Sequence, residues 1–286
     1  MNFLKSCLVL SLGLSLTASA WAAAAKAPTQ DHGQDPGQDP GALLVSKITQ
    51  GKALITQEFK ANDDLTGYVL TPAAGGLSMI VYTDHQGKYM LLGNIIDSTG
   101  QNLSAEYTDK YVTSVTAKAA LQDSAKAHWF VDGKDSAPHQ VYIAVDPNCI
   151  YCHLLYQEVF PLIDSGELQV RWIPVGFLKQ TSPGKSAALL NAKDSATADS
   201  LLRQDELKFD AKQEEGGIKA LDKSDKGADL AFTQVSENTA FFNKYGFQGT
   251  PTLIYTDKKS GKPAYYPGYL GEQAFKDLVN TMGKAW

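Results

Sequence analysis

Residues 141–153, VYIAVDPNCIYCH, combine the signals of a buried strand, a turn and a helix start in immediate succession. The apolar run 141–145 is typical of a buried strand, and the Asp-Pro-Asn that follows it is typical of a turn. Apolar side chains then recur at a spacing that fits one face of a helix, at Leu155, Val159 and Leu162. The stretch therefore predicts a strand–turn–helix unit that carries two cysteines in the first turn of its helix.

This cysteine pair is placed for thiol and disulfide chemistry. Unpaired backbone N–H groups at a helix N-terminus favour a thiolate over a thiol at Cys149. Cys152 lies one turn further on and can attack the mixed disulfide that Cys149 forms with a substrate. A disulfide between them would close a very small loop, which stabilises a fold little. We therefore expect Cys149 to attack and Cys152 to resolve, with Ile150 and Tyr151 tuning the reduction potential.

A second feature belongs to the same predicted site. Gly249-Thr250-Pro251 lies directly before an apolar strand, residues 252–255. Proline has no backbone N–H and favours a cis peptide bond there, so the loop can approach a sulfur atom closely. The Thr250 backbone stays free to pair with an extended substrate, and Tyr151 suits either substrate contact or packing. A Cys-x-x-Cys pair followed by such a Thr-Pro loop is the thioredoxin-like arrangement.

The first residues predict export. Residues 1–23 contain a lone Lys5, a short apolar run and a small-residue stretch, which is typical of a secretory signal peptide. Cleavage would remove Cys7 and leave Cys149 and Cys152 as the remaining cysteines. Residues 24–41 follow as a tether built on a Gln-Asp-Pro-Gly repeat, to which we assign no structure. The net charge of −5 argues against a nucleic-acid partner.

The chain after the tether is long enough for two modest domains joined by a helix. Residues 42–104 predict a small α+β domain, with its clearest strands at 77–83 and 89–96. Residues 105–128 are rich in alanine and other helix formers, which suits a connecting helix.

Residues 129–286 predict a second, α/β domain. Besides the strands at 141–145 and 252–255, we expect strands at 168–174 and 264–266 and a closing helix from about 271 to 282. A polar and mostly helical insert, residues 182–244, interrupts this order and contains a breaker at Gly216-Gly217. Such an order is typical of a sheet covered by helices on both faces.

Several motifs resemble the DsbG/DsbC family of periplasmic thiol:disulfide interchange proteins. In the second domain these are residues 145–149 with Cys152-His153, residues 175–179 with Ser182-Pro183, and Gly249-Thr250-Pro251. In the first domain, Gly87-Lys88-Tyr89 followed by Gly93-Asn94 and Asp97 is similar to that family's dimerisation domain. The resemblance covers nearly the whole chain after the signal peptide, except the tether.

The resemblance implies a V-shaped homodimer. Cystatin-like dimerisation domains would form its base, linker helices its arms, and thioredoxin-fold catalytic domains would face a shared cleft. It further implies a periplasmic location, no cofactor beyond the redox-active Cys149–Cys152 disulfide, and the membrane protein DsbD as electron donor. The substrates would be proteins with cysteines, whose wrong disulfides are reshuffled or whose sulfenylated cysteines are reduced.

Two details favour the DsbG side of the family. The catalytic domain has no additional cysteine pair, whereas DsbC-type proteins often carry a structural disulfide there. The insert also contains Ala192-Lys193-Asp194, which looks similar to DsbG. One detail departs from it, because Ile150 stands where DsbG-type motifs usually have proline. We therefore expect Ile150, directly after Cys149, and His153, directly after Cys152, to tune the redox properties of the pair.

Other functions stay open at this point. Full oxidation of the pair would indicate an oxidant of the DsbA type, and a binding module of the chaperone type would use the cleft and hardly need the cysteines. Cys149–His153 also matches Cys-x-x-Cys-His, the attachment motif of c-type haem. A zinc site lacks clustered ligands, and Asp146 suits a turn and capping residue better than a proton shuttle.

Overall fold

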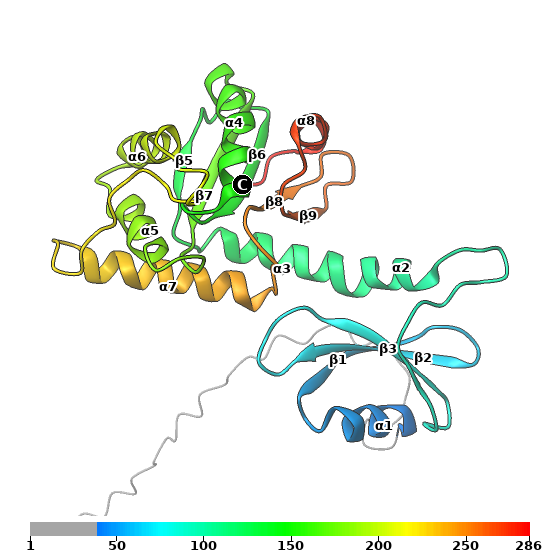
Figure 1. Ribbon diagram of the computed structural model, residues 1–286. Coiled ribbons are helices and arrows are strands. Elements are labelled where there is room, and N and C mark those ends of the chain that lie inside the picture. Colours follow the sequence, from blue (N-terminus) through cyan, green and yellow to red (C-terminus); the bar gives the residue numbers. More distant parts are fainter. Residues whose placement is uncertain (1–38) are drawn as a thin grey trace, which may run out of the picture. The chain divides into compact units, whose positions relative to one another are not determined.

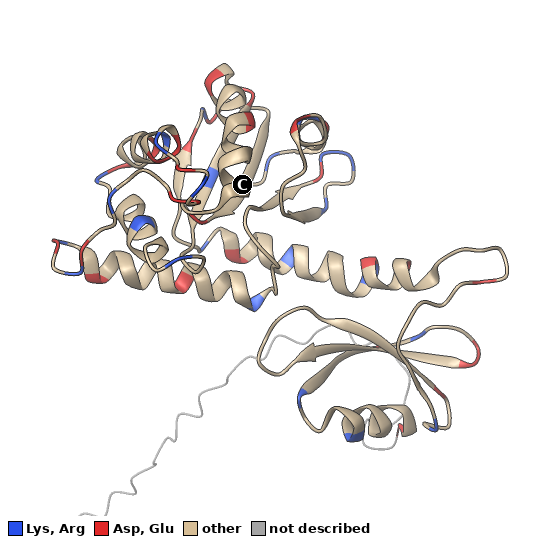
Figure 2. Ribbon diagram, in the orientation of Figure 1, with Lys and Arg blue, Asp and Glu red and all other residues tan. Residues whose placement is uncertain are grey.

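The computed structural model describes residues 39–286 (Figure 1). The predicted signal peptide, residues 1–23, and the predicted tether up to residue 38 lie outside the described residues. Every helix within residues 39–286 is too short or too polar to cross a membrane. Acidic and basic residues are interspersed over the elements of the described chain (Figure 2).

The N-terminal part is a four-stranded antiparallel sheet with one helix on a face. Its elements are α1 (Pro40–Thr49), β1 (Ala53–Lys60), β2 (Leu65–Pro72), β3 (Met79–Asp84) and β4 (Met90–Leu91). The strands follow the order β1-β2-β3-β4. Val45 of α1 packs on Tyr68 and Val81 on one face of the sheet. Phe59 and Tyr82 point to the other face, because side chains alternate along a strand.

The end of the predicted tether is helical, contrary to the sequence-based expectation. Helix α1 begins at Pro40, within the segment 24–41 to which we assigned no structure. Asp39 is its N-cap and accepts hydrogen bonds from the N–H groups of Gly41 and Ala42. Proline fits the first helical position because it has no N–H to satisfy there. The last Asp-Pro of the repeat therefore starts a helix instead of belonging to an unstructured tether.

The strand predicted at residues 89–96 is also wrong in extent. Strand β4 contains only Met90–Leu91, which pair with Thr83 and Tyr82 of β3. Gly93 follows with a φ of 147°, a conformation that a side chain would strain and that ends the pairing. The apolar residues after β4 therefore do not form a strand.

The connecting segment is helical, but shorter and less regular than the predicted 105–128. It consists of α2 (Leu103–Thr108), a π-helical turn η1 (Asp109–Thr113) and α3 (Ser114–Ser124). Asn102 caps the start by accepting the N–H of Ala105. Ala120 of α3 is fully buried in the core of the C-terminal part, which accounts for the small residues in this segment.

The C-terminal part contains a five-stranded sheet in the order β5-β7-β6-β8-β9. The strands are β5 (Phe130–Asp132), β6 (His139–Val145), β7 (Leu168–Pro174), β8 (Thr252–Thr256) and β9 (Pro263–Pro267). Strands β6 and β7 are parallel, and the other pairs are antiparallel. Because β6 is parallel to β7 and antiparallel to β8, the end of β6, the end of β7 and the start of β8 meet at one edge.

Helices cover both faces of this sheet (Figure 1). Val141, Ile143 and Val145 of β6 pack with α4 (Ile150–Ser165) and α8 (Glu272–Thr281), whereas Tyr142 and Ala144 pack with α3 and α7. The insert between β7 and β8 forms α5 (Ser182–Leu190), α6 (Ser195–Leu207) and α7 (Ala228–Lys244). Leu202 of α6 joins the same core as α4, so the insert borders the strand–turn–helix unit.

Candidate functional site

The cysteines lie where β6 gives way to α4. Cys149 is the N-cap of α4, with extended backbone angles, and Cys152 lies in the first turn of the helix. Both thiols are free. Both residues are buried, but Cys149 is 5% exposed and Cys152 only 1%, so Cys149 is the more accessible of the two.

The environment of Cys149 favours its thiolate. A hydrogen bond from the Cys152 thiol lowers the pKa of Cys149 to about 7 against the opposing effect of burial, and the backbone N–H groups of Tyr151 and Cys152 help to lower it. Burial instead raises the pKa of Cys152 well above its ordinary value, with the neighbouring Cys149 sulfur adding to it. At neutral pH the nucleophile is therefore Cys149, and Cys152 holds its proton.

We expect alkylation of the reduced protein by iodoacetamide to report this difference. The modification rate should rise with pH with a midpoint near 7, because the thiolate of Cys149 is the reacting form and its pKa is about 7. Mass spectrometry of the peptides should find the label on Cys149 and not on Cys152. Replacing Cys152 with alanine should raise the midpoint, since the largest cause of the lowered pKa is then lost. A wild-type midpoint near that of a free cysteine would contradict this account.

The loop before β8 lies against the Cys149 sulfur. The Thr250–Pro251 peptide bond is cis, and the Cys149 Sγ–H donates to the Thr250 carbonyl oxygen at 3.2 Å. Thr250 and Pro251 are buried, and the Thr252 hydroxyl donates to the carbonyl of Gly249. Strand pairing of β6 with β8 brings this loop to the cysteines across 101 residues of sequence.

Exposed apolar side chains lie at the same edge of the sheet. Tyr151, between the cysteines, is 57% exposed, while Ile150 is half-buried. Phe177 and Leu178, just after β7, are 41% and 46% exposed. Their backbone N–H groups both donate to the Asp146 carboxylate, which holds this segment beside the turn before Cys149. The exposure of Phe177 and Leu178 was not foreseen from the sequence, because an apolar Val-Gly-Phe-Leu run after a strand does not reveal which side chains face solvent.

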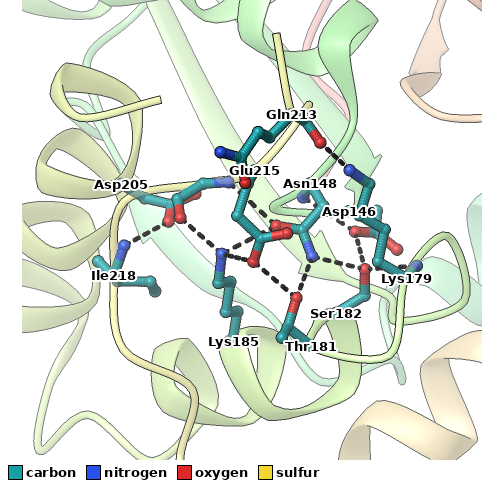
Figure 3. Close-up of polar contacts among 11 residues, drawn as sticks. Asp146, Asn148, Lys179, Thr181, Ser182, Lys185, Asp205, Gln213, Glu215 and Ile218 are labelled. Atoms are coloured by element: carbon teal, nitrogen blue, oxygen red, sulfur yellow. Dashed lines mark hydrogen bonds and ion pairs between the residues drawn. The ribbon is translucent and has the colours of Figure 1, made fainter. Parts of the chain in front are cut away.

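A buried polar cluster fixes the turn before Cys149 (Figure 3). Asp146 accepts hydrogen bonds from the Ser182 hydroxyl and from the N–H of Asn148, in the turn and capping role expected for it. Asn148 donates to the hydroxyls of Thr181 and Ser182. Lys185 is 3% exposed and donates to Asn148 Oδ1 at 2.9 Å and to Glu215 Oε1 at 2.5 Å. Hydrogen bonds from the insert therefore fix the turn that directly precedes Cys149.

His153 faces the insert. Its Nδ1 lies 2.6 Å from Glu206 Oε2 of α6, and its ring stacks on Phe209 at 4.3 Å between centroids. Gln157 Nε2 lies 3.2 Å from the other ring nitrogen. Burial lowers the pKa of His153 and raises the pKa of Glu206 to about 9. Glu206 was not singled out in the sequence, since a single acid in a polar helix carries no signal of its burial.

No group of three or more histidine, cysteine or acidic side chains within residues 39–286 is arranged to hold a metal ion. Both ring nitrogens of His153 have side-chain neighbours within hydrogen-bonding distance, so a haem iron would have to displace one of them.

Comparisons with known proteins agree with this geometry. The family model of the thioredoxin-like domain matches residues 131–283. The thiol:disulfide interchange protein DsbG of Pseudomonas aeruginosa is 35% identical over 154 residues, which are 54% of this chain and 59% of the relative. DsbG of Escherichia coli is 28% identical over 216 residues, 76% of this chain and 82% of the relative. The match to the first of these relatives thus spans less than two thirds of its length.

Solved structures are also similar. Helicobacter pylori DsbG has 19% sequence identity, with a TM-score of 0.37, and the match covers 75% of this chain and 98% of that one. Proteus mirabilis ScsC in a compact conformation has 18% identity, with a TM-score of 0.44 and coverage of 62% and 83%. The family match confirms the predicted thioredoxin fold around the cysteine pair. The chain belongs to the thioredoxin-like domain family, and the relatives it resembles are thiol:disulfide interchange proteins of the DsbG type.

Proposed function

We propose that this chain is a periplasmic dithiol–disulfide oxidoreductase that corrects or reduces cysteines in other proteins. The observation that carries the proposal is Cys149 itself, at the N-cap of α4, with a pKa lowered to about 7 by the Cys152 thiol and with the Thr250 carbonyl against its sulfur. The similarity to DsbG proteins supports the same activity.

The chain's own residues supply each step. The Cys149 thiolate attacks a substrate disulfide, so that a mixed disulfide forms and one substrate sulfur leaves as a thiolate. Cys152 then loses its proton and attacks the Cys149 sulfur, which releases the second substrate sulfur and leaves the pair oxidised. The same sequence reduces a sulfenylated cysteine, whose S–O bond breaks in the first step and whose hydroxide takes a proton from solvent and leaves as water. The Thr250 carbonyl borders the reacting sulfur, and we propose that Thr250, Pro251 and Tyr151 contact the substrate.

The direction of reaction follows from how strongly the thiolate is stabilised. A strong oxidant holds its nucleophilic cysteine as a very stable thiolate, with a pKa of about 3.5 in such proteins, whereas reductants of this fold lie near 7. The pKa of about 7 for Cys149 therefore supports a reductase over a DsbA-like oxidant. Such activity in an oxidising compartment needs an electron donor, and we propose the membrane protein DsbD.

We also propose that residues 42–104 form the dimerisation domain, residues 105–128 the linker and residues 129–286 the catalytic domain. Exposed apolar side chains support this role for the first domain, because a monomer rarely leaves so many uncovered. Among them are Leu54, Leu77, Met79, Tyr89, Leu91, Leu92 and Ile96. A homodimer would bury part of this surface.

Trapping the redox state in cells tests the proposed function. Acid quenching of cells, followed by alkylation with a mass-tagged maleimide, should find Cys149 and Cys152 mostly reduced when DsbD is present. In cells without DsbD the pair should be oxidised, because its electron supply is lost. A pair that is fully oxidised in both strains would exclude the reductase direction and indicate an oxidant. Gel filtration with light scattering of the purified protein should give the mass of a dimer.

A further inference from the structure

Helix α6 of the insert lies beside β5, the edge strand of the C-terminal sheet (Figure 1). Strand β5 contains only Phe130–Asp132 and pairs with β7 alone. Helix α6 supplies further partners to it, because the Val131 N–H donates to the Ser195 hydroxyl at 3.2 Å and Asp132 faces Arg203. A helix that covers an edge strand protects it from pairing with another chain. The same contact contains charges that the proposed function does not use.

Arg203 of α6 is shared by three carboxyl groups from three elements. Its Nε donates to both carboxylate oxygens of Asp199, on the same helix, at 2.9 and 3.1 Å. Its Nη1 and Nη2 donate to Asp164, near the end of α4, at 3.3 and 3.0 Å. Nη2 also lies 3.8 Å from Asp132 Oδ1 of β5. One guanidinium neutralises one carboxylate, so full ionisation would leave uncompensated negative charge where α4, α6 and β5 meet.

Asp132 is the group among the three that is least able to stay charged. Its side chain is 6% exposed, whereas that of Asp164 is 63% exposed. It accepts the Trp172 Nε1–H at 3.4 Å, and its carboxyl group forms a hydrogen bond with that of Asp199. Ionised carboxylates only accept hydrogen bonds, so two carboxyl groups form one only when a proton lies between them. Asp132 and Asp199 therefore share a proton inside the contact between α6 and β5.

The surroundings of Asp132 set the pH at which this proton leaves. Burial raises the pKa of Asp132 to about 7, the charge and hydrogen bond of Asp199 also raise it, and Arg203 and Trp172 lower it. Asp164 acts on Asp132 through Arg203, for which both compete. An aspartate of an unfolded chain has a pKa of about 3.9. The stabilisation by the bound proton is therefore complete below that pH and is lost as the pH rises through 7.

We propose that Asp132 and Asp199 form a pH-sensitive latch that holds α6 against the edge strand β5. With the shared proton in place the latch is closed, and Arg203 is left to the carboxylates of Asp199 and Asp164. When the proton leaves to solvent, two carboxylates face each other in a buried contact, and α6 separates more readily from β5. Helix α6 also carries Glu206, which contacts His153. The latch therefore makes the packing of the insert beside the cysteine motif depend on pH.

Urea unfolding of the full-length protein as a function of pH measures the latch. Asparagine has the shape of a protonated aspartate at every pH, so Asp132→Asn should unfold with a weaker pH dependence. Between about pH 5 and pH 8 we expect the unfolding equilibrium constant of the wild type to rise at least about 10-fold more than that of Asp132→Asn. Asp164→Asn is the matched control, because it removes an exposed carboxylate from the same guanidinium, and it should keep the wild-type pH dependence. A wild-type pH dependence in Asp132→Asn overturns the proposal.

Hydrogen exchange followed by mass spectrometry locates the change. After correction for the intrinsic effect of pH on exchange, the amides of α6 should lose protection between about pH 6 and pH 8 in the wild type, and those of α8, which carries none of these residues, should not. In Asp132→Asn the α6 amides should keep their protection. Asp199→Asn serves as the second variant if Asp132→Asn fails to fold, and it should reduce the loss because the partner charge is gone. Equal losses in α6 and α8, or an undiminished loss in these variants, overturn the latch.

Discussion

Replacing Cys149 with alanine should abolish thiol exchange, with a loss on the order of 1,000-fold or more in the rate at which a small disulfide is reduced. Cys149 is the cysteine with a pKa of about 7 and the more accessible of the two. Cys152 cannot replace it, because burial keeps its pKa well above the ordinary value and the side chain is 1% exposed. The measurement is the stopped-flow rate of the first thiolate release from dithiobis(nitrobenzoate).

Replacing Cys152 with alanine should have a different effect. Cys149 still attacks, but the mixed disulfide has no internal thiol to resolve it and accumulates. Incubation of this variant with a scrambled, disulfide-bonded substrate should therefore give a covalent complex that runs at the summed mass on a non-reducing gel and disappears on reduction. Wild-type protein should show the complex only transiently.

These two variants also test the binding-module alternative. If the chain were a binding module, Cys149→Ala would still prevent aggregation of an unfolded client, although it would abolish thiol exchange. Retention of disulfide repair in Cys149→Ala would contradict the proposed mechanism. Retention of aggregation protection alone would show that binding and exchange are separate properties of the same surface.

The local parts of the site could be predicted from the sequence because the signals that build them are local. The strand, the turn and the helix around Cys149 follow one another without interruption, and Thr250-Pro251 stands directly before its strand. Both therefore depend on short-range patterns that fix secondary structure, and strand pairing then brings them together.

The contacts that the insert makes with the turn before Cys149 and with His153 could not be predicted in this way. His153 and Glu206 are 53 residues apart, and Gly216 donates to Asn148 across 68 residues. These contacts depend on how the insert helices rotate against α4, and a polar helix pattern does not specify that rotation. The strand predicted at 89–96 was too long for a local reason. Its apolar composition is typical of a strand, but Gly93 adopts a φ that ends the strand after Leu91.

Lys185→Met should destabilise the fold by about 3 kcal/mol, because it breaks a buried ion pair and leaves its partners without a donor. Lys185 Nζ donates to Glu215, to the Gly216 carbonyl and to Asn148, and its side chain is 4% exposed (Figure 3). Methionine has nearly the same length and no charge. The measurement is the free energy of unfolding from urea denaturation followed by circular dichroism.

Lys276→Met is the control for this substitution. Lys276 forms an i,i+4 ion pair with Glu272 on α8, but its side chain is 47% exposed, so water replaces the lost interaction and no measurable change in stability is expected. A loss of similar size in both variants would mean that burial of the Lys185 pair does not matter. That outcome would contradict the inference that Lys185 of the insert fixes the turn before Cys149.

The double variant Lys185→Met/Glu215→Gln separates the ion pair from the packing. If the loss comes from an uncompensated carboxylate, neutralising Glu215 should restore about 1 kcal/mol or more relative to Lys185→Met alone. The same variants should also alter Cys149, since Lys185 reaches it through Asn148, the residue directly before it. A looser turn would hold the Cys149 sulfur less firmly at the start of α4, and the alkylation midpoint should move above 7. A loss of stability without that movement would mean that the insert stabilises the domain but does not position its nucleophile.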